Sequence, residues 1–162
     1  MSTTEHRIRN AAPADVPAIV GLIKELADFE KLGHLAQATP EKLLPQLFGE
    51  RPPVECWVAE GEEGELVAFA LFFTNFSTFL AQPGIYLEDL YVQPAHRGTG
   101  LGKAMLSRLA ALAVERGCGR FEWSVLDWNV NAIDFYKKMG AVMMDDWRIC
   151  RLTGEALAQY GR

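Results

Sequence analysis

The sequence predicts an α/β (α+β) protein built on one mixed β-sheet, with helices on both faces of the sheet. Three strand-like runs follow one another in the middle of the chain, at 55–60, 66–74 and 84–92, which favours antiparallel pairing. Later strands alternate with amphipathic helices, which favours parallel pairing through crossover connections. A single sheet covered by helices accommodates both kinds of pairing.

The N-terminal part is expected to supply one strand and two helices. Residues 7–11 have a strand-like pattern, and a helix opens at Pro13–Asp15, where a proline stands in the first turn and an acid near the positive end of the helix dipole. Apolar residues then recur at three- and four-residue spacing through about residue 29. A second helix is expected over 40–48, with Thr39 as its N-cap and a proline at its first position.

The polar segment 61–65 predicts a hairpin between the first two central strands, and 75–83 is expected to form a polar and aromatic loop. A helix is expected to follow the glycine-rich turn and to run to about Arg116, with Gly117 in the C′ position. The remaining elements are expected in this order: a strand at 121–126, a helix from Asn129 to Gly140, a strand or hairpin at about 141–152 and a weak helix at 154–160.

Composition narrows the class of protein. No interdomain linker interrupts the 162 residues, so we expect one domain over 1–162, with its core at about 6–154. A net charge of −5 argues against nucleic acid as the main partner. No apolar run reaches the ~18 residues that a membrane span needs, and the first residues lack the pattern of a signal peptide, so a cytoplasmic location is expected. The three cysteines show no CxxC spacing, which favours reduced core thiols over a metal site.

The stretch 84–103 carries the strongest functional signal. A strand ends at Val92, and Arg97-Gly-Thr-Gly-Leu-Gly102 then leads directly into a helix. Glycines at a helix N-terminus let backbone N–H groups approach an anion, and the helix dipole favours negative charge there. A phosphate or pyrophosphate site is therefore predicted.

The spacing excludes two common phosphate-binding motifs. Gly98 and Gly102 are too close for a P-loop, and Lys103 is followed by Ala104, which cannot bind magnesium. The pattern G-x-G-x-G also differs from the dinucleotide fingerprint, and no mononucleotide-binding βαβ repeat surrounds it.

The pattern R-G-x-G-x-G resembles the pyrophosphate loop of the GCN5-related N-acetyltransferases (GNAT), and the resemblance extends along nearly the whole chain. It is greatest to the spermidine/spermine (diamine) N-acetyltransferase branch and to its thialysine-acetylating relatives. The matching segments are Leu22–Ala27, Tyr86–Asp89, Arg97–Gly98, Trp128–Asn129, Phe135–Lys137, Gly140–Ala141 and Trp147–Arg148. The resemblance implies a mixed, mostly antiparallel sheet of about six to seven strands with helices on both faces.

The resemblance also implies acetyl-CoA as the acetyl donor and no metal. The residues implied to bind it are Leu90, Tyr91, Val92, Arg97, Gly98, Thr99, Gly100, Leu101, Gly102, Lys103, Asn129 and Tyr136. A backbone N–H near Leu90 would polarise the thioester carbonyl. Helix capping alone would also explain Asn129.

An amine must lose a proton before it attacks a thioester, and the departing thiolate leaves more easily when it is protonated. Glu88, at the strand end, is the candidate base, and the resemblance gives the matching residue that role. Tyr136 resembles the tyrosine that protonates the CoA sulfur, although a tyrosine on an apolar helix face can also be plain core. A solvated edge position is the other interpretation of Glu88.

The acceptor is expected to be a small amine bound by acids and aromatic side chains. The residues expected to bind it are Glu88, Asp89, Trp128, Asp145 and Asp146, with Trp147 as a further wall. Polyamine-type sequences place two acids where this chain has Gly33-His34, which favours a lysine analogue or another small primary amine over a long polycation. Acetylation of a protein N-terminus or lysine, and a silent acyl-CoA-binding module, stay open. Relatives of this branch are usually homodimers, so a homodimer is expected.

Overall fold

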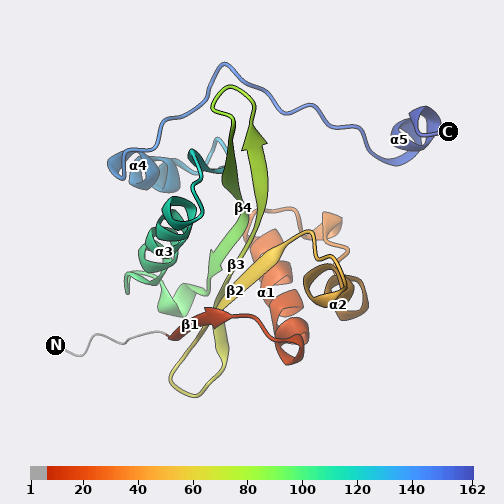
Figure 1. Cartoon of the computed structure of the whole chain (residues 1–162). Helices are drawn as coiled ribbons and strands as arrows, with labels where there is room; N and C mark the ends of the chain where they lie inside the picture. The colour runs from red at the N-terminus through yellow and green to blue at the C-terminus, as the bar shows by residue number, and fades with distance from the viewer. Residues whose placement is uncertain (1–6) are drawn as a thin grey trace. The chain divides into compact units, whose positions relative to one another are not determined.

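The computed structural model describes residues 7–162. The chain divides into two compact units, and the boundary between them in the sequence lies after Ser124. The first unit holds the sheet and three α-helices (Figure 1). The second, from Val125 to Arg162, holds two short helices. The expectation of one domain over 1–162 stays a prediction.

The first unit is built on a five-stranded sheet whose strands lie in sequence order. These strands are β1 (Arg7–Asn10), β2 (Glu55–Glu60), β3 (Leu66–Ser77), β4 (Gln82–Val92) and β5 (Arg120–Trp123). The first three pairings are antiparallel and the β4–β5 pairing is parallel. This confirms the mixed, mostly antiparallel sheet. The described residues form fewer strands than the six to seven that were expected.

Helices cover both faces of this sheet, as predicted (Figure 1). The helices α1 (Val16–Phe29) and α2 (Pro40–Phe48) lie on one face, and α3 (Leu101–Glu115) lies on the other. Three 3₁₀ turns accompany them: Pro13–Asp15, Gly33–Leu35 and Pro94–His96. Thr39 caps α2 as expected, since its side chain accepts a hydrogen bond from the Lys42 N–H at 3.2 Å.

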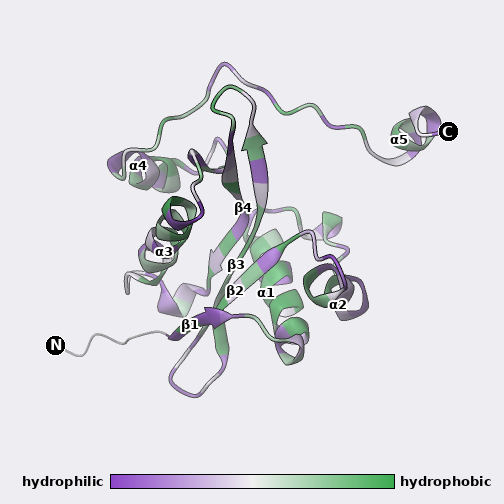
Figure 2. Ribbon diagram, viewed as in Figure 1, coloured by the Kyte–Doolittle hydropathy of each residue, from purple (hydrophilic) through white to green (hydrophobic). Residues whose placement is uncertain are grey.

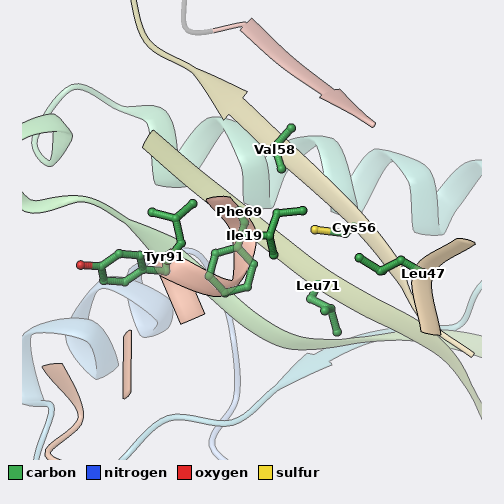
Figure 3. Close-up of a cluster of buried hydrophobic side chains, with 8 residues drawn as sticks. Ile19, Leu47, Cys56, Val58, Phe69, Leu71 and Tyr91 are labelled. Carbon is green, nitrogen blue, oxygen red and sulfur yellow. The ribbon is translucent and has the colours of Figure 1, made fainter. Parts of the chain in front are cut away.

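The core beneath α1 and α2 is apolar and fully enclosed. Its buried members come from both helices and from three strands: Ile19, Leu22, Leu47, Cys56, Val58, Phe69, Leu71 and Tyr91 (Figure 3). The hydrophobic colouring gathers on β3 and α1, whereas the loop between β2 and β3 is hydrophilic (Figure 2). On the other face α3 buries Leu101, Met105 and Leu109, at helical spacing. The end of β4 is thereby held between two packed layers.

The loop expected at 75–83 is shorter in the structure. Asn75 pairs with Gly84 and Ser77 with Gln82, so that only four residues, 78–81, connect the two strands. The Ser77 hydroxyl accepts a hydrogen bond from the Leu80 N–H at 3.2 Å, which closes the turn. The polar residues had suggested a loop because this end of the hairpin is largely exposed and carries no alternating pattern.

The second unit contains α4 (Val130–Lys138) and α5 (Gly154–Tyr160), both close to their predicted positions. The strand expected at 141–152 is wrong, because this segment has no regular secondary structure. A strand is stable only when another strand satisfies its backbone groups, and no described strand pairs with this segment. The preceding strand also ends early, at Trp123 instead of 126. No described helix is long and apolar enough to cross a membrane.

Candidate active site

A β-bulge in β4 places Glu88 out of register with β3. Leu71 pairs with Asp89 and the next residue, Phe72, pairs with Leu87, so Glu88 has no partner in β3. A bulge of this kind bends the strand and re-aims the side chain of the extra residue. The bulge therefore sets the direction of the Glu88 carboxylate, which is exposed.

The same position marks the end of pairing along the other edge of β4. The pairing with β5 covers only Gly84 to Leu87. No strand among the described residues pairs with that edge beyond Leu87, where Leu90, Tyr91 and Val92 follow. An uncovered strand edge presents backbone N–H and C=O groups that another chain of amides can pair with.

Two neighbouring carboxyl groups act on the carboxyl group of Asp89 at this bulge. Burial, together with the negative charges of Glu88 and Glu30, raises the pKa of Asp89 to about 6. Burial also raises the pKa of Glu30, which directly follows the last residue of α1. Sequence reasoning missed Glu30, because the approach of the α1 end to β4 is a feature of tertiary packing. The only sequence signal was its place just before Gly33-His34, where this chain lacks the two acids of the polyamine-type sequences.

The glycine-rich loop has the backbone conformation that an anion-binding turn needs. Gly98 and Gly100 have φ angles of +78° and +85°, which L side chains rarely adopt. Gly100 is the N-cap of α3 and supplies no capping side chain, so the first-turn N–H groups face outward without one. Leu101 is buried and anchors the helix start, and the Thr99 hydroxyl donates to the His96 carbonyl at 2.7 Å. Such a conformation is compatible with an anion site, and the diphosphate-binding role of the loop stays a prediction.

Arg97 fastens this loop to the sheet and to α1. Its Nε donates to the Val92 carbonyl at 2.8 Å. Its guanidinium carbon lies 4.8 Å from the ring centroid of Phe29 and 5.5 Å from that of Tyr91. Both distances fall within the range of cation–π contacts. At the other end of the loop, Lys103 is exposed, and Gly102 has open space beside it apart from one contact with Val92.

The other predicted site residues lie in the second unit. Asn129 caps α4, its side-chain oxygen accepting from the Ala132 N–H at 3.4 Å. Burial raises the pKa of Tyr136, whose ring meets Phe135 edge-on with centroids 5.8 Å apart. That phenol is therefore protonated at neutral pH. Whether these two side chains approach Glu88 stays a prediction.

Three predicted acceptor-binding residues are exposed in this unit. Trp128 comes just before α4, and its side chain is 46% exposed. Asp145 and Asp146 lie in the segment without regular structure. Their roles stay predictions. Among the described residues, no group of three His, Cys, Asp or Glu side chains is arranged to hold a metal ion.

Comparisons with known proteins agree with this geometry. Residues 22–141 match the acetyltransferase (GNAT) family. The chain is 39% identical to mouse thialysine N-epsilon-acetyltransferase over 94% of this chain and 95% of that protein. It is 38% identical to L-ornithine N5-acetyltransferase of Arabidopsis thaliana, over 93% of this chain and 86% of that protein.

The fold is shared with solved structures. An integron cassette protein from the mobile metagenome of V. cholerae superimposes with a TM-score of 0.80 at 25% identity, covering 97% of this chain and 98% of its own. The bulged strand, the uncovered strand edge and the glycine-rich loop thus occur in a chain that matches one family over most of its length. The protein belongs to the GNAT family and is an acetyl-CoA-dependent N-acetyltransferase.

Proposed function

We propose that this enzyme acetylates the side-chain amine of a small basic amino acid of the ornithine or thialysine type. The observation that carries the proposal is a group of three carboxylates: Glu88 and Asp89 in β4, and Glu30 directly after α1. Negative charges crowded together raise the pKa of one of their number, and a bound cation relieves that repulsion. An alkylammonium group fits such a site.

The number of acids favours a short acceptor. Gly33 and His34 stand where polyamine-type relatives carry two carboxylates, and both lie in the short 3₁₀ turn after α1. Relatives named for ornithine and for thialysine are 38% and 39% identical to this chain, whereas a spermidine/spermine N(1)-acetyltransferase-like protein is 34% identical. Spermidine and putrescine are therefore the second class of acceptor to test.

In this proposal, acetyl-CoA binds to the glycine-rich loop and to the uncovered edge of β4. The N–H groups at the start of α3 bind the diphosphate, and Lys103 adds a positive charge beside it. The backbone of Leu90, Tyr91 and Val92 pairs with the amides of the pantetheine arm, and the N–H of Leu90 or a neighbour polarises the thioester carbonyl. Acetyl-CoA supplies the thioester carbon that the amine attacks.

Proton transfer is assigned to two residues. Glu88, directed by the bulge, accepts a proton from the acceptor ammonium directly or through a water molecule. Tyr136, with its raised pKa, holds the proton that the departing sulfur needs. Asp89 and Glu30 hold the ammonium in place. The resemblance to the family assigns donor binding to Asn129 and acceptor binding to Trp128, Asp145 and Asp146.

We further propose that the protein is a cytoplasmic homodimer. Exposed aromatic side chains support an interface: Phe76 is 64% exposed, Phe79 92% and Trp147 74%. The oligomeric state is checked by sedimentation or light scattering of the purified protein.

The test of the acceptor is a panel of amines with acetyl-CoA, followed by release of free thiol. Ornithine, thialysine, lysine, putrescine, spermidine and a peptide with a free N-terminus make up the panel. We expect kcat/KM for ornithine or thialysine to exceed that for spermidine by at least about ten-fold, as one missing charge contact in a binding site costs roughly 1.4 kcal/mol or more. Preference for spermidine or for the peptide would contradict the proposal. If no amine of the panel released thiol, the proposed acceptor class would be contradicted as well.

A further inference from the structure

One side of the C-terminal half of α1 faces the end of β4 with two unlike side chains. Glu25 and Phe29 are four residues apart and therefore lie on the same side of the helix. Glu25 accepts hydrogen bonds from the Tyr91 hydroxyl at 3.2 Å and from the Gln93 side-chain amide at 3.2 Å. Phe29 lies against the guanidinium of Arg97. One helix thus contacts the strand end and the first residue of the glycine-rich loop.

Tyr91 is the centre of these contacts. Its ring is 5% exposed and packs in the core cluster, while its hydroxyl points away from the other labelled side chains (Figure 3). Burial raises the pKa of Tyr91, and the Glu25 carboxylate raises it further, whereas Arg97 lowers it. The hydroxyl therefore keeps its proton and donates a hydrogen bond to Glu25.

Arg97 contacts both α1 and the end of β4. Its guanidinium lies against the rings of Phe29 and Tyr91, and its Nε holds the carbonyl of Val92. The donated hydrogen bond fixes one backbone group of the strand edge, and the planar contacts fix the start of the loop. Tyr91 thus contacts the side chain that joins the start of the loop to the end of the strand.

We propose that Glu25 is a positioning residue for acetyl-CoA binding. It touches neither the donor nor the acceptor. It acts through Tyr91 and Gln93, which hold the last residues of β4, and through Tyr91 on Arg97, which orients the loop. The inference rests on the proposed placement of the diphosphate at residues 97–103, and it does not depend on which amine is the acceptor.

Loss of Glu25 is expected to change donor binding more than folding. Its carboxylate is exposed, and Gln93 is only half-buried, so water can replace the lost hydrogen bonds at low cost to stability. The geometry of the loop, in contrast, is no longer fixed. The KM for acetyl-CoA should rise while kcat and the KM for the amine stay unchanged, a split that a purely structural role would not produce.

The experiment measures the Kd for CoA by calorimetry, together with the steady-state constants of the intact enzyme. Glu25→Ala should weaken CoA binding roughly three- to ten-fold, the effect of one ordinary hydrogen bond. Glu25→Gln keeps an acceptor for the Tyr91 hydroxyl and should restore most of the affinity. Lys24→Ala, the exposed neighbour on α1, should bind CoA like the wild-type protein.

Two further variants make the outcome decisive. Tyr91→Phe removes the same hydrogen bond without touching Glu25, and its effect should not add to that of Glu25→Ala in a double-mutant cycle. Lys103→Glu tests the placement itself, because reversed charge at the start of α3 should weaken CoA binding strongly. Normal binding by Glu25→Ala beside weakened binding by Lys103→Glu would overturn the inference alone. Normal binding by Lys103→Glu would overturn the proposed donor site.

Discussion

Glu88 and Asp89 are neighbours in β4, yet only Asp89 has a partner, Leu71, in the adjacent strand. The bulge thereby turns one carboxylate toward solvent and leaves the other half-buried beside it. Burial, with the repulsion of Glu88 and Glu30, raises the pKa of Asp89 to about 6. One irregularity of the sheet thus produces two acids with different protonation behaviour, which an enzyme acting on a cation can use for different tasks.

The raised pKa of Asp89 predicts how stability changes with pH. The folded protein binds the proton of the Asp89 carboxyl group more tightly than the unfolded chain does, because the ordinary pKa of Asp89 is 3.8. The contribution of Asp89 to the free energy of unfolding is therefore full below about pH 4 and is lost as the pH rises through about 6. The loss is at most about 3 kcal/mol, and partial exposure of the side chain makes it smaller. In Asp89→Asn this loss should disappear. Urea unfolding at pH 4.5 and 7.5 measures it, with Glu62→Gln in the exposed β2–β3 loop as the control. An identical pH dependence in wild type and Asp89→Asn would contradict the prediction.

Replacing Glu88 separates the base from the binding acids. Glu88→Gln should lower kcat about 10²- to 10⁴-fold, the usual contribution of a general base, while the Kd for CoA stays near the wild-type value. The matched control is Glu63→Gln, an exposed acid in the β2–β3 loop. Stopped assays at saturating acetyl-CoA and amine give kcat. Retention of full activity by Glu88→Gln would show that this side chain is only a solvated charge at the strand edge.

Two glycines of the loop should respond in opposite ways to the same substitution. Gly100 has a φ of +85°, so Gly100→Ala should destabilise the protein by about 1 kcal/mol. Gly102 lies inside α3, where an added Cβ would meet only Val92 at 3.8 Å, an ordinary contact. Gly102→Ala should therefore stabilise the helix by roughly 0.5–1 kcal/mol. Thermal or urea unfolding of the two variants checks the contrast. Equal effects of both would contradict the requirement for a left-handed residue at 100.

The sequence predicted most elements because their signals are local. The N-cap at Thr39 and the glycines at 117 and 140 depend on the backbone of adjacent residues, and the structure confirms the cap together with positive φ angles at both glycines. The loop 97–102 is also a local feature, because its glycines and the helix that follows them are contiguous in the sequence.

Features that depend on tertiary packing could not be predicted in this way. The strand expected at 141–152 had a suitable composition, but pairing depends on a neighbouring strand, which composition does not reveal. The bulge at Glu88 is a relation between two strands, so residue types alone do not reveal it, and only the resemblance to the family suggests a bulge in this region. The contact of Glu25 with Tyr91 and the effect of Glu30 on Asp89 both arise because the C-terminal part of α1 lies against β4.

Tyr136 offers the last test of the proposed chemistry. Its pKa is raised by burial, so it carries its proton at the pH at which a thiolate would leave. Tyr136→Phe should lower kcat about 10²-fold or more and leave the KM for the amine nearly unchanged, because the ring and its contact with Phe135 persist. Tyr160→Phe in α5, whose side chain is 78% exposed, is the matched control. The decisive comparison uses thioester donors whose thiols have lower pKa values than CoA. Such donors need less help from an acid, so the difference between wild type and Tyr136→Phe should shrink with them, whereas a constant difference would assign Tyr136 to packing alone.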